Sequence, residues 1–221
     1  MALCCSLLGS CTVVKIEEED AKGEDQYSTW TKTGTGFKAA EFVASVWEER
    51  IIPTYEEEAI EYTTLISALG DDPSAASDEY GLRRQTGEPF YVFKVRGNAR
   101  VVEFDDSSRN GVIGVAMISP DDTQTEIEAT LQVGPVIRGT AIRDSVEFIR
   151  FTDVGNQLQF AELASHLNAR MLSDSVEPLD LSTLTGSCIS FLGAFRLEEE
   201  APLEEIVITP VRITPIECVD E

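Results

Sequence analysis

The sequence predicts an α+β fold, because the spacing of its apolar residues changes once along the chain. Before residue 81, apolar side chains recur every three or four positions, which is typical of amphipathic helices. After residue 90 they recur at every second position, which is typical of half-buried strands, and a helix-like stretch over 156–171 follows the third strand. This β-β-β-α-β-β order indicates a five-stranded OB-like β-barrel. We therefore expect an N-terminal helical segment, 38–81, packed on such a barrel over 90–217, with a helix inserted before the last hairpin.

Three helices are expected in the N-terminal part. The first begins near Lys38, and Pro53 should break or kink it, because proline lacks an N–H group and its ring clashes with the preceding turn. The motif Thr54-x-x-Glu57 is typical of the start of a second helix. The apolar stripe of that helix consists of Tyr55, Ala59, Tyr62, Ile66 and Leu69. A third, short helix begins at Asp72-Pro73 and ends at Gly81.

The strands follow from alternation and turn residues. The first runs over 90–104 with a bend or bulge at Gly97, and Asn110-Gly111 marks the turn into the second, 112–118. The third, 125–133, should point Ile127, Ala129, Leu131 and Val133 inward and Glu126, Glu128, Thr130 and Gln132 outward. A short helix within 140–150 and a longer one capped by Asn156 precede the final hairpin of 187–197 and 204–217.

The charge of the chain excludes several classes of partner. Its 221 residues include 40 Asp and Glu against 17 Lys and Arg, so the formal net charge is −23. Nucleic-acid binding requires clustered cations, so we expect no nucleic-acid partner, and electrostatic docking to anionic lipid is equally disfavoured. The hydrophobic share of 43% is enough for a packed core, and the length fits one domain.

The N-terminus predicts export. Residues 1–10 are uncharged and mostly apolar or small, as in a secretory leader, and Leu8-Gly9-Ser10-Cys11 resembles a bacterial lipobox, in which the cysteine accepts the lipid. We therefore expect a leader over 1–10, lipidation of Cys11, a polar tether over 11–37 and one domain over 38–221. The expected location is periplasmic or extracytoplasmic, with the lipid anchored in a membrane. The leader contains no Lys or Arg, so a cytosolic protein with an apolar N-terminus is the alternative.

After cleavage, Cys188 and Cys218 would remain besides Cys11. An even pair of cysteines in an exported protein is a candidate disulfide, and folding of the last hairpin would bring these two together. Two separate buried thiols are an equally good interpretation, since cysteine packs well as a small apolar side chain.

The sequence contains no set of residues that indicates catalysis. His166 is the only histidine and lies within an expected helix, without a nucleophile motif. No cluster of Cys and His has the spacing of a zinc site. We therefore expect a protein that is not an enzyme and that holds no metal or cofactor.

The segment from Gln132 to Asp144 is the candidate for a binding or structural loop. It places Arg138 and Arg143 five residues apart, where they could form an anion-binding patch. Alternatively they pair with Asp144, Glu147 or another nearby carboxylate and hold the loop against the barrel, which is the interpretation we favour. The candidate residues are Gln132, Gly134, Pro135, Arg138, Gly139, Thr140, Arg143, Asp144 and Asn156.

The same segment carries a family resemblance. Gln132 to Asp144, followed by Phe148-Ile149-x-Phe151 and Asn156-Gln157-x-x-x-Ala161, resembles a family of predicted bacterial periplasmic lipoproteins, domain of unknown function 2291. Further points of resemblance are Asp72-Pro73 with Tyr80-Gly81, and the lipobox position of Cys11. The resemblance implies an exported lipoprotein without known catalytic residues, often associated with sugar-type ABC transport systems.

Two functions follow as expectations. The first is a lipid-anchored accessory lipoprotein, with components of an ABC transporter as partners. The second is an OB-like module that binds a small ligand, either a sugar or an organic anion. For a sugar, the candidate stacking residues are Trp30, Trp47, Tyr91 and Phe93.

Overall fold

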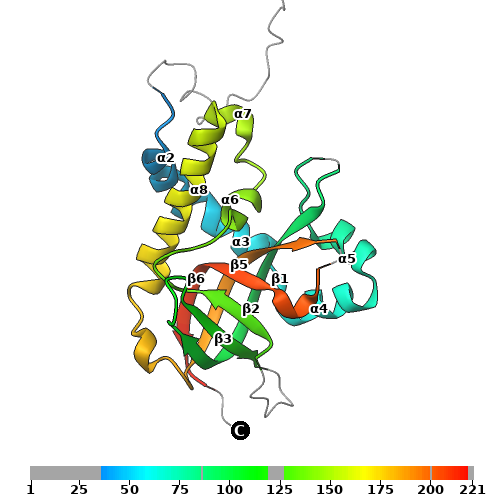
Figure 1. Cartoon of the computed structure of the whole chain (residues 1–221), viewed down its shortest axis with the longest axis vertical. Coiled ribbons are helices and arrows are strands. Elements are labelled where there is room, and N and C mark those ends of the chain that lie inside the picture. Colours follow the sequence, from blue (N-terminus) through cyan, green and yellow to red (C-terminus); the bar gives the residue numbers. More distant parts are fainter. Residues whose placement is uncertain (1–35, 86, 119–126, 200, 219–221) are drawn as a thin grey trace, which may run out of the picture.

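A computed structural model describes residues 36–85, 87–118, 127–199 and 201–218 and shows an α+β molecule built on a six-stranded sheet (Figure 1). Along the sheet the strands run in the order β1-β2-β3-β4-β6-β5, and β5 pairs again with β2. The five longer strands therefore close into a ring. The strands are β1 (Ile60–Glu61), β2 (Phe90–Asp105), β3 (Val112–Met117), β4 (Ala129–Gln132), β5 (Cys188–Glu198) and β6 (Val207–Ile216).

The length of β2 makes this closure possible. Its first part, from Phe90 to Arg100, pairs antiparallel with β5, while residues from Ala99 to Asp105 pair antiparallel with β3. Antiparallel pairings of β3 with β4 and of β5 with β6, and a short parallel pairing of β4 with β6, complete the ring. The sixth strand, β1, lies outside this ring, and its two residues pair in parallel with Val95 and Arg96.

Gly97 has a different role from the predicted bend. The pairing of β2 with β5 continues through Gly97, and the irregularity lies instead between Val101 and Glu103, in the pairing with β3. A Cβ atom at Gly97 would lie 3.1 Å from the ring of Phe191. The glycine therefore admits a buried aromatic side chain.

For the third expected strand, the predicted assignment of residues to its inward and outward faces was partly wrong. Residues 125 and 126 lie outside the described part, and β4 begins only at Ala129. Leu131 and Val133 are buried as predicted, but Ile127 is 43% exposed. Gln132, expected to face outward, is only 6% exposed, because its amide bonds with neighbouring segments.

The N-terminal helices break at a different place from the prediction. Their elements are α2 (Ala39–Val46), the π-helix η2 (Trp47–Ile51), α3 (Ile52–Glu58), α4 (Tyr62–Asp71) and α5 (Pro73–Tyr80). Pro53 does not break the chain's helical path, since it occupies the first turn of α3 and follows the wider turn of η2. The break comes at β1, because these residues add a strand to the sheet. The predicted helix is therefore two helices, although four of its five stripe residues are buried.

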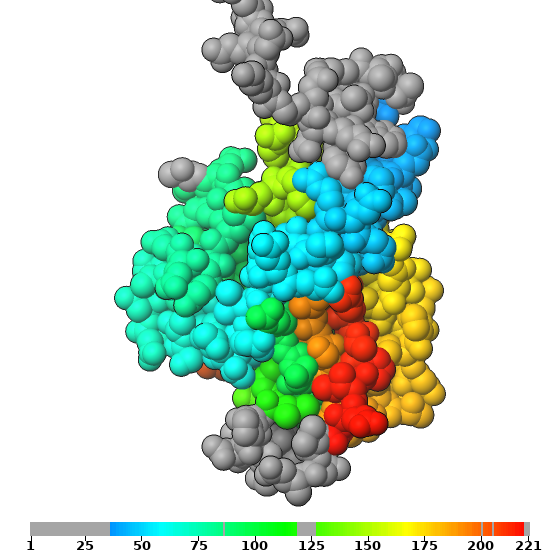
Figure 2. Space-filling view, turned by 180° about the vertical axis from the view of Figure 1, so that it is seen from behind, coloured from blue at the N-terminus to red at the C-terminus, as the bar shows by residue number. Residues whose placement is uncertain are grey.

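A second helical group joins β4 to β5. It contains α6 (Ala141–Asp144), α7 (Phe151–Val154), α8 (Gln157–Met171), the π-helix η3 (Leu172–Val176) and the 3-10 helix η4 (Leu181–Thr183), and a further 3-10 helix, η5 (Leu203–Glu205), precedes β6. Residues of α8 contact both α2 and β6. From the opposite side, Figure 2 shows α3 in cyan above the orange and red strands, with α8 in yellow beside them.

One hydrophobic core joins the helices to the sheet. Trp47 of η2, Phe93 of β2 and Phe195 of β5 are among the largest fully buried side chains. The rings of Phe93 and Phe195 stack with centroids 5.2 Å apart. Within the described residues, no helix combines the length and the apolar composition needed to cross a bilayer.

Candidate functional site

The candidate loop, here called the 132–144 segment, leaves the end of β4 and leads into α6. Gln132 closes its first half. The side-chain Oε1 accepts from the backbone N of Arg138 at 2.8 Å, and Nε2 donates to the backbone O of Arg138 at 3.1 Å. The same Nε2 donates to Thr209 Oγ1 on β6 at 2.8 Å. Gln132 thus fixes the loop to the sheet.

Gly134 is required by a close backbone contact. Its N–H donates to the carbonyl of Gly111, in the turn between β2 and β3, at 2.7 Å. A Cβ atom at Gly134 would lie 2.0 Å from the backbone N of Gly111, so any other residue would displace the loop. Pro135, which follows, is exposed and lines a shallow pocket of about 390 Å³ beside the same turn.

The interpretation that we favour from the sequence, pairing of Arg138 with Asp144 or Glu147, is wrong: in the described structure Arg138 bonds to Asn110. In the amide orientation that satisfies both groups, Asn110 Oδ1 accepts from Arg138 Nε at 2.9 Å and from Nη2 at 2.7 Å. The Asn110 amide also donates to Val136 O at 3.2 Å. The arginine therefore holds the loop through the hairpin turn that Asn110 was expected to form.

Arg143 does pair with Asp144. Its Nε donates to Asp144 Oδ1 at 2.7 Å, and Nη1 donates to the carbonyl of Phe160 at 3.0 Å. The guanidinium also lies 3.8 Å from the centroid of the Phe160 ring. Asp144 is only 7% exposed, and Thr140 donates to its second oxygen. Every charged group of this pair is therefore used within the molecule, as the favoured interpretation predicted for Arg143.

Gly139 and Asn156 serve the same local order. Gly139 has a φ of 87°, a left-handed conformation that favours glycine, and its carbonyl accepts from Asn168 Nδ2 of α8 at 3.2 Å. Asn156 caps α8, because its Oδ1 accepts from the backbone N of Gln159 at 3.0 Å. Both residues therefore have a structural role in this part of the fold.

Sequence reasoning missed Arg84, the side chain with the most bonds to this region. Its guanidinium donates to four backbone carbonyls, at 3.0, 2.5, 2.6 and 2.6 Å; they belong to Asp144, Ile149, Arg143 and Val146. Burial lowers the pKa of Arg84, and the nearby Asp144 opposes that shift. Backbone carbonyls have no sequence signature, so only the adjacent pair Arg83-Arg84 in an acidic chain could have drawn attention to this residue.

Ser145, which follows α6, connects the segment to the helices. Tyr55 of α3 donates to Ser145 Oγ at 2.6 Å, and that hydroxyl in turn donates to Ile142 O at 3.0 Å. Burial raises the pKa of Tyr55, so this phenol stays protonated. Lys94 of β2 donates to Ser145 O at 2.8 Å and lies 2.8 Å from a carboxylate oxygen of Glu58. The 132–144 segment and its surroundings thus form a bonded structural unit.

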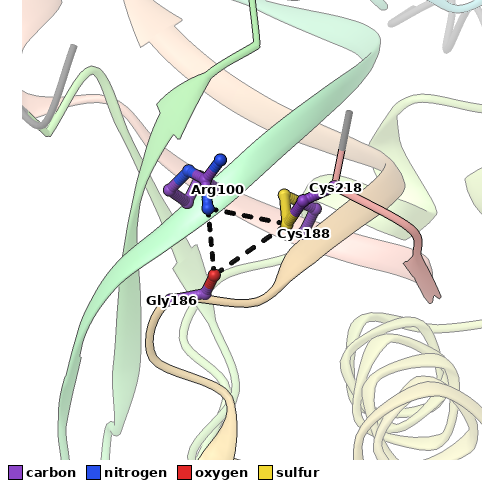
Figure 3. The surroundings of a disulfide bond; sticks show 4 residues. All are labelled: Arg100, Gly186, Cys188 and Cys218. Atoms are coloured by element: carbon purple, nitrogen blue, oxygen red, sulfur yellow. Dashed lines mark hydrogen bonds between the residues drawn. A yellow bond between two sulfur atoms is a disulfide. The ribbon is translucent and has the colours of Figure 1, made fainter. Parts of the chain in front are cut away.

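Cys188 and Cys218 form a disulfide (Figure 3). Cys188 is the first residue of β5 and pairs with Ile216, the last residue of β6, so the hairpin places Cys218 within reach. Beside the bond, Arg100 Nη1 donates to Gly186 O at 3.2 Å and lies 3.6 Å from Cys218 Sγ. The disulfide attaches the end of the described chain to the ring of strands.

The larger described cavity lies at the other end of β4. We call it the α4–β4 groove, and its volume is about 540 Å³. Three elements form its walls: α4, the residues up to the start of β4, and the residues around η5. The lining residues are Tyr62, Thr63, Ile66, Ser67, Ile127, Glu128, Ala129, Thr130, Leu203, Glu204 and Ile206.

The aromatic residues proposed for sugar stacking do not line this groove. Trp47 and Phe93 are 1% and 0% exposed, because both belong to the core. The ring of Tyr91 is covered by the guanidinium of Arg83, 4.0 Å from its centroid. Trp30 lies outside the described residues, as does Cys11. Within the described part of the chain, no group of three or more His, Cys, Asp or Glu has an arrangement that could hold a metal ion.

A family model described as "Predicted periplasmic lipoprotein (DUF2291)" matches residues 1–214. The chain belongs to the DUF2291 family. This match confirms the family resemblance, and the family description agrees with the predicted extracytoplasmic location and lipid anchor. No curated protein matches this DUF2291 chain.

A solved structure supports the fold of this DUF2291 protein. It is an OB-fold protein from Thermotoga maritima MSB8, with a TM-score of 0.67 and 16% sequence identity. The match covers 82% of this chain and 99% of that one. At this identity the similarity shows the fold alone, and it confirms the OB-like fold predicted from the order of strands and helices.

Proposed function

We propose that this protein is a non-enzymatic accessory protein, attached to a membrane through lipid on Cys11, that binds a small ligand in the α4–β4 groove. The family description supports the anchor and the location. The bonding of the 132–144 segment supports a structural role for that segment, because Arg138 and Arg143 are used by Asn110, Asp144 and Phe160. The groove is then the better candidate for binding.

The position of the groove carries this proposal. OB folds bind ligands over the second and third strands of their ring and over the adjoining loops. Counted along the chain from β2, β4 is the third strand of the ring, and Leu203 and Glu204 belong to the loop between the fourth and fifth strands. A volume of about 540 Å³ also lies within the range of roughly 300–1,000 Å³ that is usual for small-molecule sites.

Ligand binding is tested by thermal unfolding with a panel of sugars, organic acids and amines, since a ligand of the native state raises the midpoint. Ser67→Trp would fill the groove from α4 and abolish any such rise. Ser74→Trp, at an exposed position of α5 outside the groove, is the matched control. A rise that survives Ser67→Trp would place the ligand elsewhere.

The anchor is tested by metabolic labelling with a palmitate analogue. Wild-type protein expressed in a bacterial host should carry the label, and Cys11→Ser should not. Equal labelling of the two proteins, or none on wild type, would contradict lipidation at Cys11.

The proposed partners are components of a sugar-type ABC transporter, as the family resemblance implies. Co-purification from membranes tests this part of the proposal independently of ligand binding. Recovery of a permease or a binding protein with the wild type but not with an unrelated lipoprotein would support it. Absence of every transporter component would contradict it and leave the ligand-binding role as the function.

A further inference from the structure

We propose that the α4–β4 groove binds a small organic cation, an amine or guanidine attached to an apolar body, rather than an organic anion or a sugar. The inference rests on the proposed ligand-binding role and assigns the ligand class. It follows from the walls of the groove: their apolar side chains, their charges and the groups that hold those charges in place.

The apolar walls would receive the body of the ligand. Ile66 from α4, Leu203 from η5 and Ile127 before β4 all line the groove. Ile127 is 43% exposed, so part of its side chain is open to a ligand in the groove. It lies over the outer side of the sheet, since a Cβ atom at Gly114 would meet its Cδ1 at 2.7 Å. Covering these side chains is favourable by the hydrophobic effect.

The charges on the groove are all of one sign among the described residues that line it. Glu128 and Glu204 are present, and neither Lys nor Arg is. An organic anion entering the groove would therefore lose water and meet only carboxylates. A cation would gain a charge-assisted hydrogen bond, which is about twice as strong as a neutral one.

Glu128 is held in position by the protein backbone. Its Oε2 accepts from the backbone N of Met117 at 2.6 Å, which uses one of its two carboxylate oxygens. Its own backbone carbonyl accepts from the phenol of Tyr62, on α4, at 2.9 Å. Burial, with Glu128 as the second cause, raises the pKa of Tyr62 to about 12, so the phenol stays a neutral donor. The carboxylate therefore needs little reordering to accept a ligand ammonium group.

A sugar fits these walls less well. Sugar sites commonly place the face of an aromatic ring against the apolar face of the ligand, and Tyr62 is the aromatic residue among the described lining residues. Tyr62 is 3% exposed and its hydroxyl is already bonded to Glu128. Its ring is therefore part of the core rather than a platform for stacking.

The test compares hexylamine, hexanol and hexanoate, which share one apolar chain and differ in their charged group. Calorimetric titration should show binding in the order amine, alcohol, acid, with the acid undetectable. Glu128→Gln should weaken hexylamine roughly tenfold and leave hexanol unchanged, because the amide keeps an acceptor for Met117 but loses the charge. Glu204→Gln provides a second reading at an exposed position.

Glu162→Gln is the control for nonspecific attraction of a cation to an acidic protein, because Glu162 lies on the exposed side of α8 and outside the groove. That variant should bind hexylamine like the wild type. An equal effect of all three Gln variants would overturn the site. Equal binding of the three hexyl compounds, blocked by Ser67→Trp, would overturn the cation preference and preserve the ligand-binding role. No binding of any of them would overturn the cation proposal, and the ligand panel described above would then decide the ligand-binding role separately.

Discussion

The 132–144 segment and the α4–β4 groove lie at the two ends of β4 and use polar side chains in opposite ways. In the segment, the side chains of Gln132, Arg143 and Asp144 all bond within the molecule. At the groove, Glu128 and Glu204 border an open volume of about 540 Å³, although one carboxylate oxygen of Glu128 also accepts from the backbone of Met117. The arginines that singled out the segment in an acidic sequence are used for structure. The cavity is bordered instead by two glutamates, a residue type that is common along the whole chain.

The largest expected effect breaks the segment. Arg84→Ala removes four bonds to backbone carbonyls and a cation 3.8 Å from Asp144. We expect a loss of about 4 kcal/mol in the free energy of unfolding, because four backbone carbonyls lose their donor and Asp144 keeps only one of its two neighbouring arginines, Arg143. Urea unfolding followed by circular dichroism measures it.

Arg109→Ala is the control, since that arginine is exposed on the hairpin turn. Its effect should stay below about 0.5 kcal/mol. Equal losses for the two variants would mean that the bonds of Arg84 to the segment stabilise the fold no more than an exposed arginine does.

The disulfide provides a covalent bond whose contribution to the free energy of unfolding can be compared with that of Arg84. Its cysteines are 30 residues apart, and closing a loop of that length is expected to stabilise the folded state by about 3.5 kcal/mol. Adding a reductant should lower the urea midpoint of wild type accordingly. The Cys188→Ala/Cys218→Ala double variant should unfold at the same urea concentration with and without reductant; a response of that variant would contradict the assignment of the effect to this bond.

A smaller effect is expected at the contact between two glycines. Gly134→Ala places a methyl group against the backbone of Gly111, so we expect a loss of about 2 kcal/mol through overpacking. Gly70→Ala is the opposite case, because it lies in α4 with nothing within 4 Å of the added Cβ. It should stabilise by about 0.5 kcal/mol, since alanine favours helix. Thermal unfolding of both variants gives the signs, and a stabilising Gly134→Ala would show that the loop is loosely held.

The smallest effect on stability is expected at the groove. Glu204→Gln should change the free energy of unfolding by less than about 0.5 kcal/mol, because the side chain is exposed. The same variant should weaken hexylamine binding, measured by titration. A large loss of stability would indicate that Glu204 has a structural partner and would remove the contrast between the two regions.

Much of the fold was predictable because it depends on local spacing. The alternation in β2 and the pairing signals Asn110-Gly111 gave the first hairpin, and the Asn156 cap gave the start of α8. The predicted break at Pro53 does not occur, and the wide turn of η2 that precedes this proline has no recognisable pattern in the sequence. The short strand β1 was missed for a similar reason: it exists through its pairing with β2, 35 residues away in the register Ile60 to Val95.

The candidate site was less predictable than the fold. The sequence identified the 132–144 segment and favoured pairing of its arginines with nearby carboxylates. Arg143 follows this prediction, whereas Arg138 is held by the amide of Asn110. It did not identify Arg84, whose partners are carbonyl groups common to every residue. It also did not identify the groove, because Thr63, Glu128 and Leu203 come from three distant parts of the chain.

The sequence by itself determined the class of the fold, the order of its main elements, the family and the expected export of the chain. These depend on periodicity, turn chemistry and motifs, all of which are local in the chain. The tertiary structure alone decided which charges are spent on internal bonds and which border a cavity. That division depends on burial and on backbone partners, and both arise only when segments distant in sequence pack together.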